Sequence, residues 1–137
     1  MDVKELRIGN LVTDEYYEHF NTLITVESIS EKGINLRIED DGNYPECAKT
    51  WIEPDDRIDK LRGIPLSDEL LEKTGAHKIK HIHGYSFFSF HNRKCNVALD
   101  IYETRTEFNG RTIKHIEFLH QLQNAWSIIT GKELEIK

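Results

Sequence analysis

The chain has 137 residues, of which 38% are hydrophobic and 31% are charged, and its formal net charge is −6. This balance is typical of a folded globular protein and excludes a disordered chain. No apolar run approaches the roughly 18–20 residues of a membrane-spanning helix, so we expect no membrane partner. The N-terminus has no apolar signal core, and the 2 cysteines, Cys47 and Cys95, have no metal-type or redox spacing. We therefore expect a cytoplasmic protein without a cofactor.

Charge is distributed unevenly along the chain. Residues 1–64 contain 15 Asp and Glu against 8 Lys and Arg, a net charge of −7, whereas residues 65–137 contain 9 against 10, a net charge of +1. The acidic half would repel a phosphate backbone, which disfavours nucleic acid as a partner. The second half contains six of the seven histidines and gains positive charge as the pH falls. Weak nucleic-acid binding by the second half is therefore kept as an alternative.

The first predicted domain, residues 1–63, consists of short β-strands. The predicted strands cover residues 6–12, 23–29, 34–39 and 49–53. Gly9-Asn10 predicts a turn or bulge in the first strand. In the second strand apolar and polar residues alternate only in part, which predicts a strand covered on both faces. In the third strand apolar and polar residues alternate strictly, which predicts that three side chains point inward: Ile34, Leu36 and Ile38. Four or five short strands over this length predict a small SH3-like β-barrel.

The second predicted domain, residues 64–137, combines helices with an antiparallel sheet. Ser67 predicts the start of a short helix that Gly75 ends. Strands follow at residues 78–83, 85–90, 94–102 and 111–117, and residues 132–136 predict a short edge strand. The third of these strands directs Cys95 inward as an inert thiol. Asn109-Gly110 predicts a two-residue hairpin that sets Ile101 opposite Phe118 and Glu103 opposite Ile116, so we expect a bulge near Glu103.

The last predicted helix, residues 118–130, has one apolar side and one uncharged polar side. Gly131 predicts its end. At about 100° per residue, one stripe collects the apolar side chains Phe118, Leu119, Leu122, Ala125, Trp126 and Ile129. The opposite side carries His120, Gln121, Gln123, Asn124 and Ser127. These polar side chains are candidates for binding a protein partner, and the alternatives are a solvated face or amides that bond their own domain.

Two further groups of residues are candidate sites. His81 and His83 project side by side if residues 78–83 form a strand, and His115 or His91 would supply a third ligand for zinc. Tyr16, Tyr17 and Trp51, with Phe20 and Tyr44, lie in or beside the barrel loops. They would grip a basic or proline-containing peptide, or alternatively close the ends of the barrel. No catalytic or phosphate-binding motif is present, so no catalytic residue is assigned.

Three stretches belong together: Leu6 to Val12, Ile64 to Leu71, and Leu119 to Leu134. They resemble a family of small uncharacterised proteins from gut Bacteroidetes and their phages or mobile elements. The family patterns are "LRIGNxV", "IPLTEEWL" and "VHQLQNLYFALTGEEL". This chain departs from them at Leu119 and at Ala125-Trp126-Ser127, which preserve the apolar stripe. The resemblance implies a shared fold and a bacterial or phage setting, and it implies no activity or substrate.

The sequence thus predicts an α+β protein, with an SH3-like barrel followed by a capped short helix and a sheet packed by the C-terminal helix. The predicted function is a non-catalytic interaction or accessory protein, related to phages or mobile elements. The alternatives are a metal-binding protein or enzyme that uses the strand histidines, and a protein whose C-terminal half binds nucleic acid weakly. The sequence indicates no oligomeric state.

Overall fold

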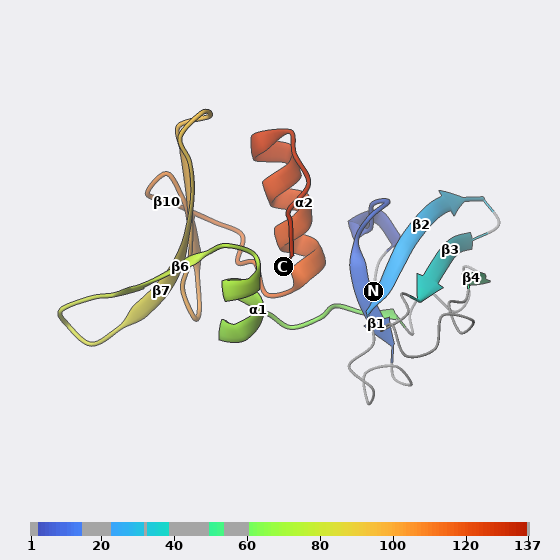
Figure 1. Ribbon diagram of the computed structural model, residues 1–137, viewed down its shortest axis with the longest axis horizontal. Coiled ribbons are helices and arrows are strands. Elements are labelled where there is room, and N and C mark those ends of the chain that lie inside the picture. Colours follow the sequence, from blue (N-terminus) through green and yellow to red (C-terminus); the bar gives the residue numbers. More distant parts are fainter. Residues whose placement is uncertain (1–2, 15–22, 32, 39–49, 54–60, 137) are drawn as a thin grey trace. The chain divides into compact units, whose positions relative to one another are not determined.

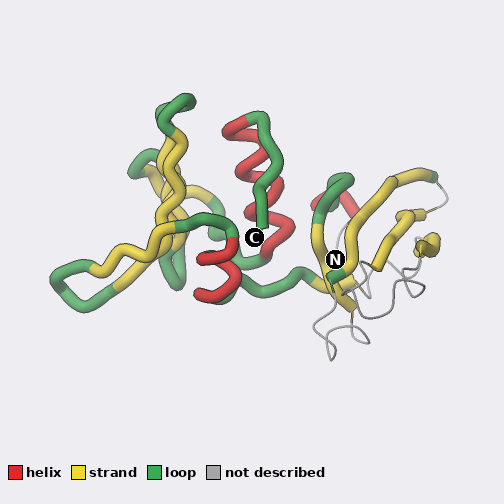
Figure 2. Tube along the Cα trace, viewed as in Figure 1, coloured by secondary structure: helices red, strands yellow, loops and turns green. Residues whose placement is uncertain are grey.

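The computed structural model describes residues 3–14, 23–31, 33–38, 50–53 and 61–136, and the fold is α+β (Figures 1 and 2). The chain divides into two compact units, Met1–Ile64 and Pro65–Lys137. The sequence placed this boundary between residues 63 and 64. Each unit contains one antiparallel five-stranded sheet, and the second unit also contains both α-helices.

The first unit begins with a 3-10 turn, Val3–Glu5, and its sheet has the order β4-β3-β2-β1-β5. The strands are β1 (Leu11–Asp14), β2 (Ile24–Ser30), β3 (Gly33–Ile38), β4 (Thr50–Glu53) and β5 (Leu61–Arg62). One face encloses a core of seven buried side chains: Leu6, Val12, Ile24, Val26, Ile34, Leu36 and Leu61. The inward orientation predicted for the third strand is confirmed, because Ile34, Leu36 and Ile38 are all buried. Within the described residues the sheet is open, with β4 and β5 at its edges.

Two predictions for the first unit are wrong. The first strand starts at Leu11 and not at Leu6. The turn predicted at Gly9-Asn10 is confirmed, and in it the backbone N–H of Arg7 donates to Asn10 Oδ1 over 2.7 Å. Gly9 has a φ of 91°, a left-handed conformation that suits a glycine in this turn. The second strand is not covered on both faces, because Ile24 and Val26 are buried while its last three residues are exposed.

The second unit has a consecutive meander of strands in the order β10-β9-β8-β7-β6. The strands are β6 (His77–Lys80), β7 (Ser86–Asn92), β8 (Val97–Ile101), β9 (Thr106–Phe108) and β10 (Arg111–Ile113). The helices α1 (Asp68–Lys73) and α2 (Leu119–Thr130) lie on the same side of this sheet (Figure 1). The ring of Trp126 in α2 lies 5.6 Å from the ring of Phe90 in β7, centroid to centroid. Leu119 and Leu122 of α2 have no exposed surface.

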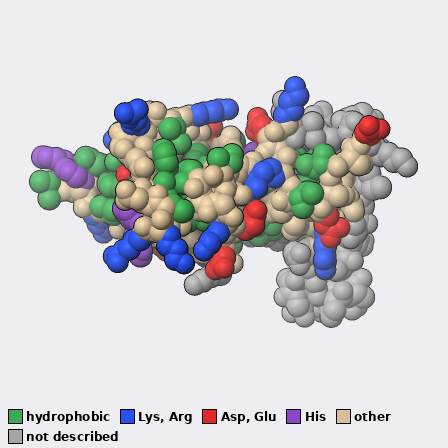
Figure 3. Space-filling model, turned by 90° about the horizontal axis from the view of Figure 1, so that it is seen from above, with side chains coloured by type: hydrophobic (Ala, Val, Ile, Leu, Met, Phe, Trp, Pro, Cys, Tyr) green, Lys and Arg blue, Asp and Glu red, His purple; other side chains and the backbone are tan. Residues whose placement is uncertain are grey.

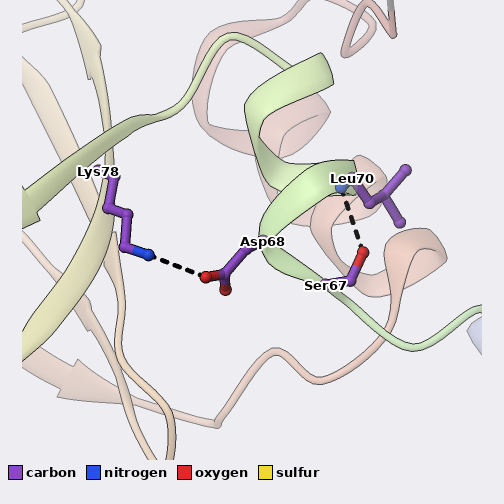
Figure 4. Close-up of polar contacts among 4 residues, drawn as sticks. All are labelled: Ser67, Asp68, Leu70 and Lys78. Carbon is purple, nitrogen blue, oxygen red and sulfur yellow. Dashed lines mark hydrogen bonds and ion pairs between the residues drawn. The ribbon is translucent and has the colours of Figure 1, made fainter.

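Both predicted helices are confirmed, together with the residues that end them. The Ser67 hydroxyl oxygen accepts a hydrogen bond from the Leu70 N–H over 3.2 Å, which satisfies one donor of the first turn of α1 (Figure 4). Gly131 has a φ of 71° and donates its N–H to the Ser127 carbonyl, closing α2. At the start of α2, the Gln121 side-chain oxygen accepts from the N–H groups of Glu117 and Phe118. Gln121 therefore supplies the cap that Phe118 lacks.

The sheet of the second unit differs from its prediction at three places. The Asn109-Gly110 hairpin pairs Arg111 with Phe108 as predicted, but Ile101 pairs with Thr106 and not with Phe118. The chain reverses at Tyr102–Arg105, where the Tyr102 N–H donates to the Arg105 carbonyl, so the expected bulge at Glu103 is a complete turn. Cys95 lies in the turn before β8 and its thiol is exposed, not inward. Residues 132–136 form no strand.

Candidate functional site

The structure does not assemble the predicted metal site. His81 and His83 lie in the turn between β6 and β7, not on a strand, with their ring centroids 5.0 Å apart. The backbone N–H of His83 donates to His81 Nδ1 over 3.2 Å, so this nitrogen already accepts a hydrogen bond. His115 contacts Thr106 and the Glu103 carbonyl instead. In the part of the chain that the structure describes, no three His, Cys, Asp or Glu side chains are placed to hold one metal ion.

The polar side of α2 is largely incorporated into the fold. His120 and Gln123 are 1% and 4% exposed. Both residues, and Asn124, take part in interactions within the chain. Gln121 caps its own helix, as described above. His120 and Gln123 are therefore enclosed in the folded chain and have too little surface to contact a partner.

The predicted aromatic site lies mostly outside the described residues. Tyr16 and Tyr17 are outside them, as are Phe20 and Tyr44. Trp51 is described as a backbone position of β4, paired with Leu36 of β3.

The second unit contains a cavity of about 540 Å³ that sequence reasoning did not predict. Its apolar lining residues come from α1 and the residues before it, from β7 and β8, and from the segment before α2: Leu66, Leu71, Phe88, Ile101 and Ile116. Three carboxylates also line it, from Asp68, Glu103 and Glu117. These residues are far apart in the sequence, so no local pattern indicates that they share one cavity.

The carboxylates give the cavity an excess of negative charge. Lys78 Nζ lies 3.0 Å from Asp68 Oδ2 and 5.8 Å from the centre of the Phe88 ring, so Asp68 already has a cationic partner (Figure 4). Glu103 and Glu117 are exposed. Neither of their carboxylates forms an ion pair with another described residue. The cavity therefore has a mixed lining of apolar and polar side chains, with two carboxylates that favour a cation.

A buried threonine holds the rim of this cavity in place. Thr106 has no exposed surface, and its Oγ1 accepts a hydrogen bond from the Ile116 N–H over 2.9 Å. The hydroxyl proton is then directed to His115 Nδ1 at 3.0 Å, and His115 Nε2 donates to the Glu103 carbonyl at 3.1 Å. Because both ring nitrogens are engaged, His115 fastens two rim segments together and does not present a base to a substrate.

Tyr102 also lines the cavity but does not supply a base. Its ring stacks on Phe87 at a centroid distance of 4.5 Å, and Arg105 Cζ lies 3.9 Å from the ring centre. Burial raises the pKa of the Tyr102 phenol, and a hydrogen bond and the negative charge of Glu107 raise this pKa further. The hydroxyl is therefore a donor at neutral pH.

A serine, a histidine and an aspartate meet elsewhere on the sheet, at Ser89, His91 and Asp100. Ser89 Oγ lies 2.9 Å from His91 Nε2 and donates its proton to Asp100. A hydroxyl has one proton, so His91 Nε2 must donate to Ser89 Oγ, the reverse of what a catalytic triad requires. Ser89 is also 1% exposed. This cluster is therefore not a nucleophilic site.

Comparison with protein-family models, with curated protein sequences and with solved structures found no match for this chain. Among the described residues, neither helix has the length and apolar character needed to cross a bilayer.

Proposed function

We propose that the protein is a cytoplasmic, non-catalytic interaction protein of a bacterium, phage or mobile element, and that the cavity of its second unit receives a cationic side chain of a partner. One observation carries this proposal: Glu103 and Glu117 line a cavity together with apolar side chains, and among the described lining residues the one imidazole, His115, has both ring nitrogens engaged. A lysine or arginine side chain matches this lining, because its stem is apolar and its head is charged.

The size of the cavity agrees with such a ligand. Its volume of about 540 Å³ falls within the range of roughly 300–1,000 Å³ that ligand pockets occupy. Because Glu103 and Glu117 are exposed, each charge contributes about 0.2–1 kcal/mol, as exposed ion pairs do. We therefore expect weak binding of a single side chain, with affinity supplied by the rest of the partner.

The test is a titration of the full chain with acetyl-arginine amide and acetyl-lysine amide, followed by ¹H–¹⁵N NMR. Both compounds should shift the resonances of Leu66 and Ile116, whereas acetyl-glutamate amide should not. Glu103→Gln and Glu117→Gln should each weaken binding roughly threefold, and the double variant roughly tenfold. Glu72→Gln in α1 is the matched control, because Glu72 is exposed and does not line the cavity. Unchanged binding by the double variant would overturn the proposal.

We also propose that the first unit is an SH3-like barrel. The strand order β5-β1-β2-β3-β4 supports this, because such barrels are five-stranded meanders in which the last strand returns to pair with the first. On this proposal Tyr16, Tyr17 and Trp51 bind a basic or proline-containing peptide. Binding of such a peptide should be lost in Tyr16→Ala/Tyr17→Ala. Equal binding by this variant would exclude this site.

A further inference from the structure

The hairpin of β6 and β7 projects from the second unit and ends in an ordered tip, residues 81–85 (Figure 1). All four residues of β6 are exposed, and β6 is an edge strand that pairs with β7. Two backbone hydrogen bonds close the tip, from His81 N–H to the Tyr85 carbonyl at 2.8 Å and from Gly84 N–H to the His81 carbonyl at 3.0 Å. The tip is therefore exposed but has a defined turn.

Three rings form a continuous stack at this tip. The rings of His81 and Tyr85 are nearly parallel, with centroids 4.4 Å apart and an interplanar angle of 7°. The ring of His83 also stacks on the ring of His81, with centroids 5.0 Å apart and an interplanar angle of 27°. The hydrogen bond from the His83 N–H to His81 Nδ1 fixes the two imidazoles relative to each other. His83 is exposed, so the stack ends in a ring that is accessible to a ligand.

The segment that forms the hairpin tip carries charge of one sign. Residues 77–86 contain two lysines and three histidines and no Asp or Glu, although the whole chain has a net charge of −6. Lys78 is paired with Asp68, which leaves exposed Lys80 as the cation of the tip. Figure 3 shows histidine and hydrophobic side chains gathered at this protruding end. An anionic partner is therefore favoured.

We propose that the tip of the β6–β7 hairpin binds single-stranded nucleic acid, with a base stacked on His83 at the end of the His83–His81–Tyr85 stack and a phosphate at Lys80. Unpaired bases stack on aromatic and imidazole rings whatever their sequence, and lysine supplies the phosphate contact. A duplex does not expose base faces. An anionic membrane fits less well, because the tip offers one fully exposed aliphatic side chain, Ile82 at 91%, among polar rings.

The test uses the full chain and a fluorescent single-stranded oligonucleotide of about 12 nucleotides at about 20 mM NaCl, measured by anisotropy. The wild type should bind, and should bind a duplex of the same length more weakly. His83→Gln should weaken binding at least roughly fivefold, because it removes the terminal ring. Lys80→Gln should weaken binding. It should also reduce the slope of the logarithm of the binding constant against the logarithm of the salt concentration by about one, because one phosphate contact is lost.

Two matched control variants distinguish binding at the tip from nonspecific electrostatic binding to other positive side chains. His77→Gln removes an exposed imidazole of the same hairpin outside the stack, and Lys114→Gln removes an exposed lysine outside the hairpin. Both should bind within about twofold of the wild type. An NMR spectrum that changes only near the substituted residue shows that each variant is folded.

Three results would overturn the proposal. They are no binding by the wild type at low salt, equal binding by His83→Gln and the wild type, and a preference for the duplex. Capture by anionic phosphatidylserine vesicles that Ile82→Ser abolishes, without oligonucleotide binding, would assign the tip to a membrane surface instead.

Discussion

Replacing Thr106 by valine tests whether a polar relay, and not packing alone, holds the rim of the cavity. The substitution keeps the shape of the side chain but removes the acceptor of the buried Ile116 N–H and the donor to His115 Nδ1. An unsatisfied buried N–H costs about 1–3 kcal/mol, and the lost bond to His115 adds about 0.5–1.5 kcal/mol. We therefore expect Thr106→Val to lower the free energy of unfolding by about 1.5–4.5 kcal/mol.

Urea unfolding measures this loss, and Thr106→Ser is the control. With a slope of about 2 kcal/mol per molar urea, Thr106→Val should lower the midpoint by about 1–2 M while the slope stays unchanged. Serine retains the hydroxyl and loses one methyl group, so it should cost about 1 kcal/mol. A valine variant as stable as the wild type, or less damaged than the serine variant, would refute the relay. Either result would mean that hydrophobic contact dominates at this position.

Three other predictions concern individual side chains: a core leucine, a helix cap and a phenol. Leu122→Ala should lower the free energy of unfolding by about 3–5 kcal/mol, because Leu122 has no exposed surface; a loss below about 1 kcal/mol in a urea titration would contradict its place in the core. Ser67→Ala should cost about 1 kcal/mol by removing the acceptor for the Leu70 N–H, and Ser67→Asp should restore most of it. Spectrophotometric titration should show a phenol, absent in Tyr102→Phe, that ionises above its ordinary range. Glu107→Gln should lower the pKa of Tyr102, and an unchanged titration would exclude this cause.

The pH dependence of stability follows from the same phenol. Its pKa is raised in the folded chain, so the neutral form is favoured by folding. The contribution of Tyr102 to stability is therefore fully present below the ordinary phenol pKa of 10.0 and is lost as the pH rises through the folded-state value. Urea midpoints measured on both sides of this range should fall more steeply for the wild type than for Tyr102→Phe.

The sequence by itself determined the features that depend on a few neighbouring residues. Ser67 and Gly131 mark helix ends because a cap bonds within one turn and a left-handed residue needs no distant partner. Alternation in β3 placed Ile34 and Leu36 inward because side chains of a strand alternate between its faces. The Asn109-Gly110 turn set the register of its own hairpin for the same local reason.

Tertiary structure alone decided the reversal at Tyr102–Arg105, the exposure of Cys95, and the burial of His120 and Gln123. Each depends on which strands pair and on which element covers a given face. The periodic pattern of apolar residues specifies neither of these. The cavity depends most strongly on tertiary structure, because its carboxylates come from α1, from the turn after β8 and from the segment before α2. Residues that meet only after the chain has folded leave no spacing in the sequence, so their shared chemistry becomes visible only in three dimensions.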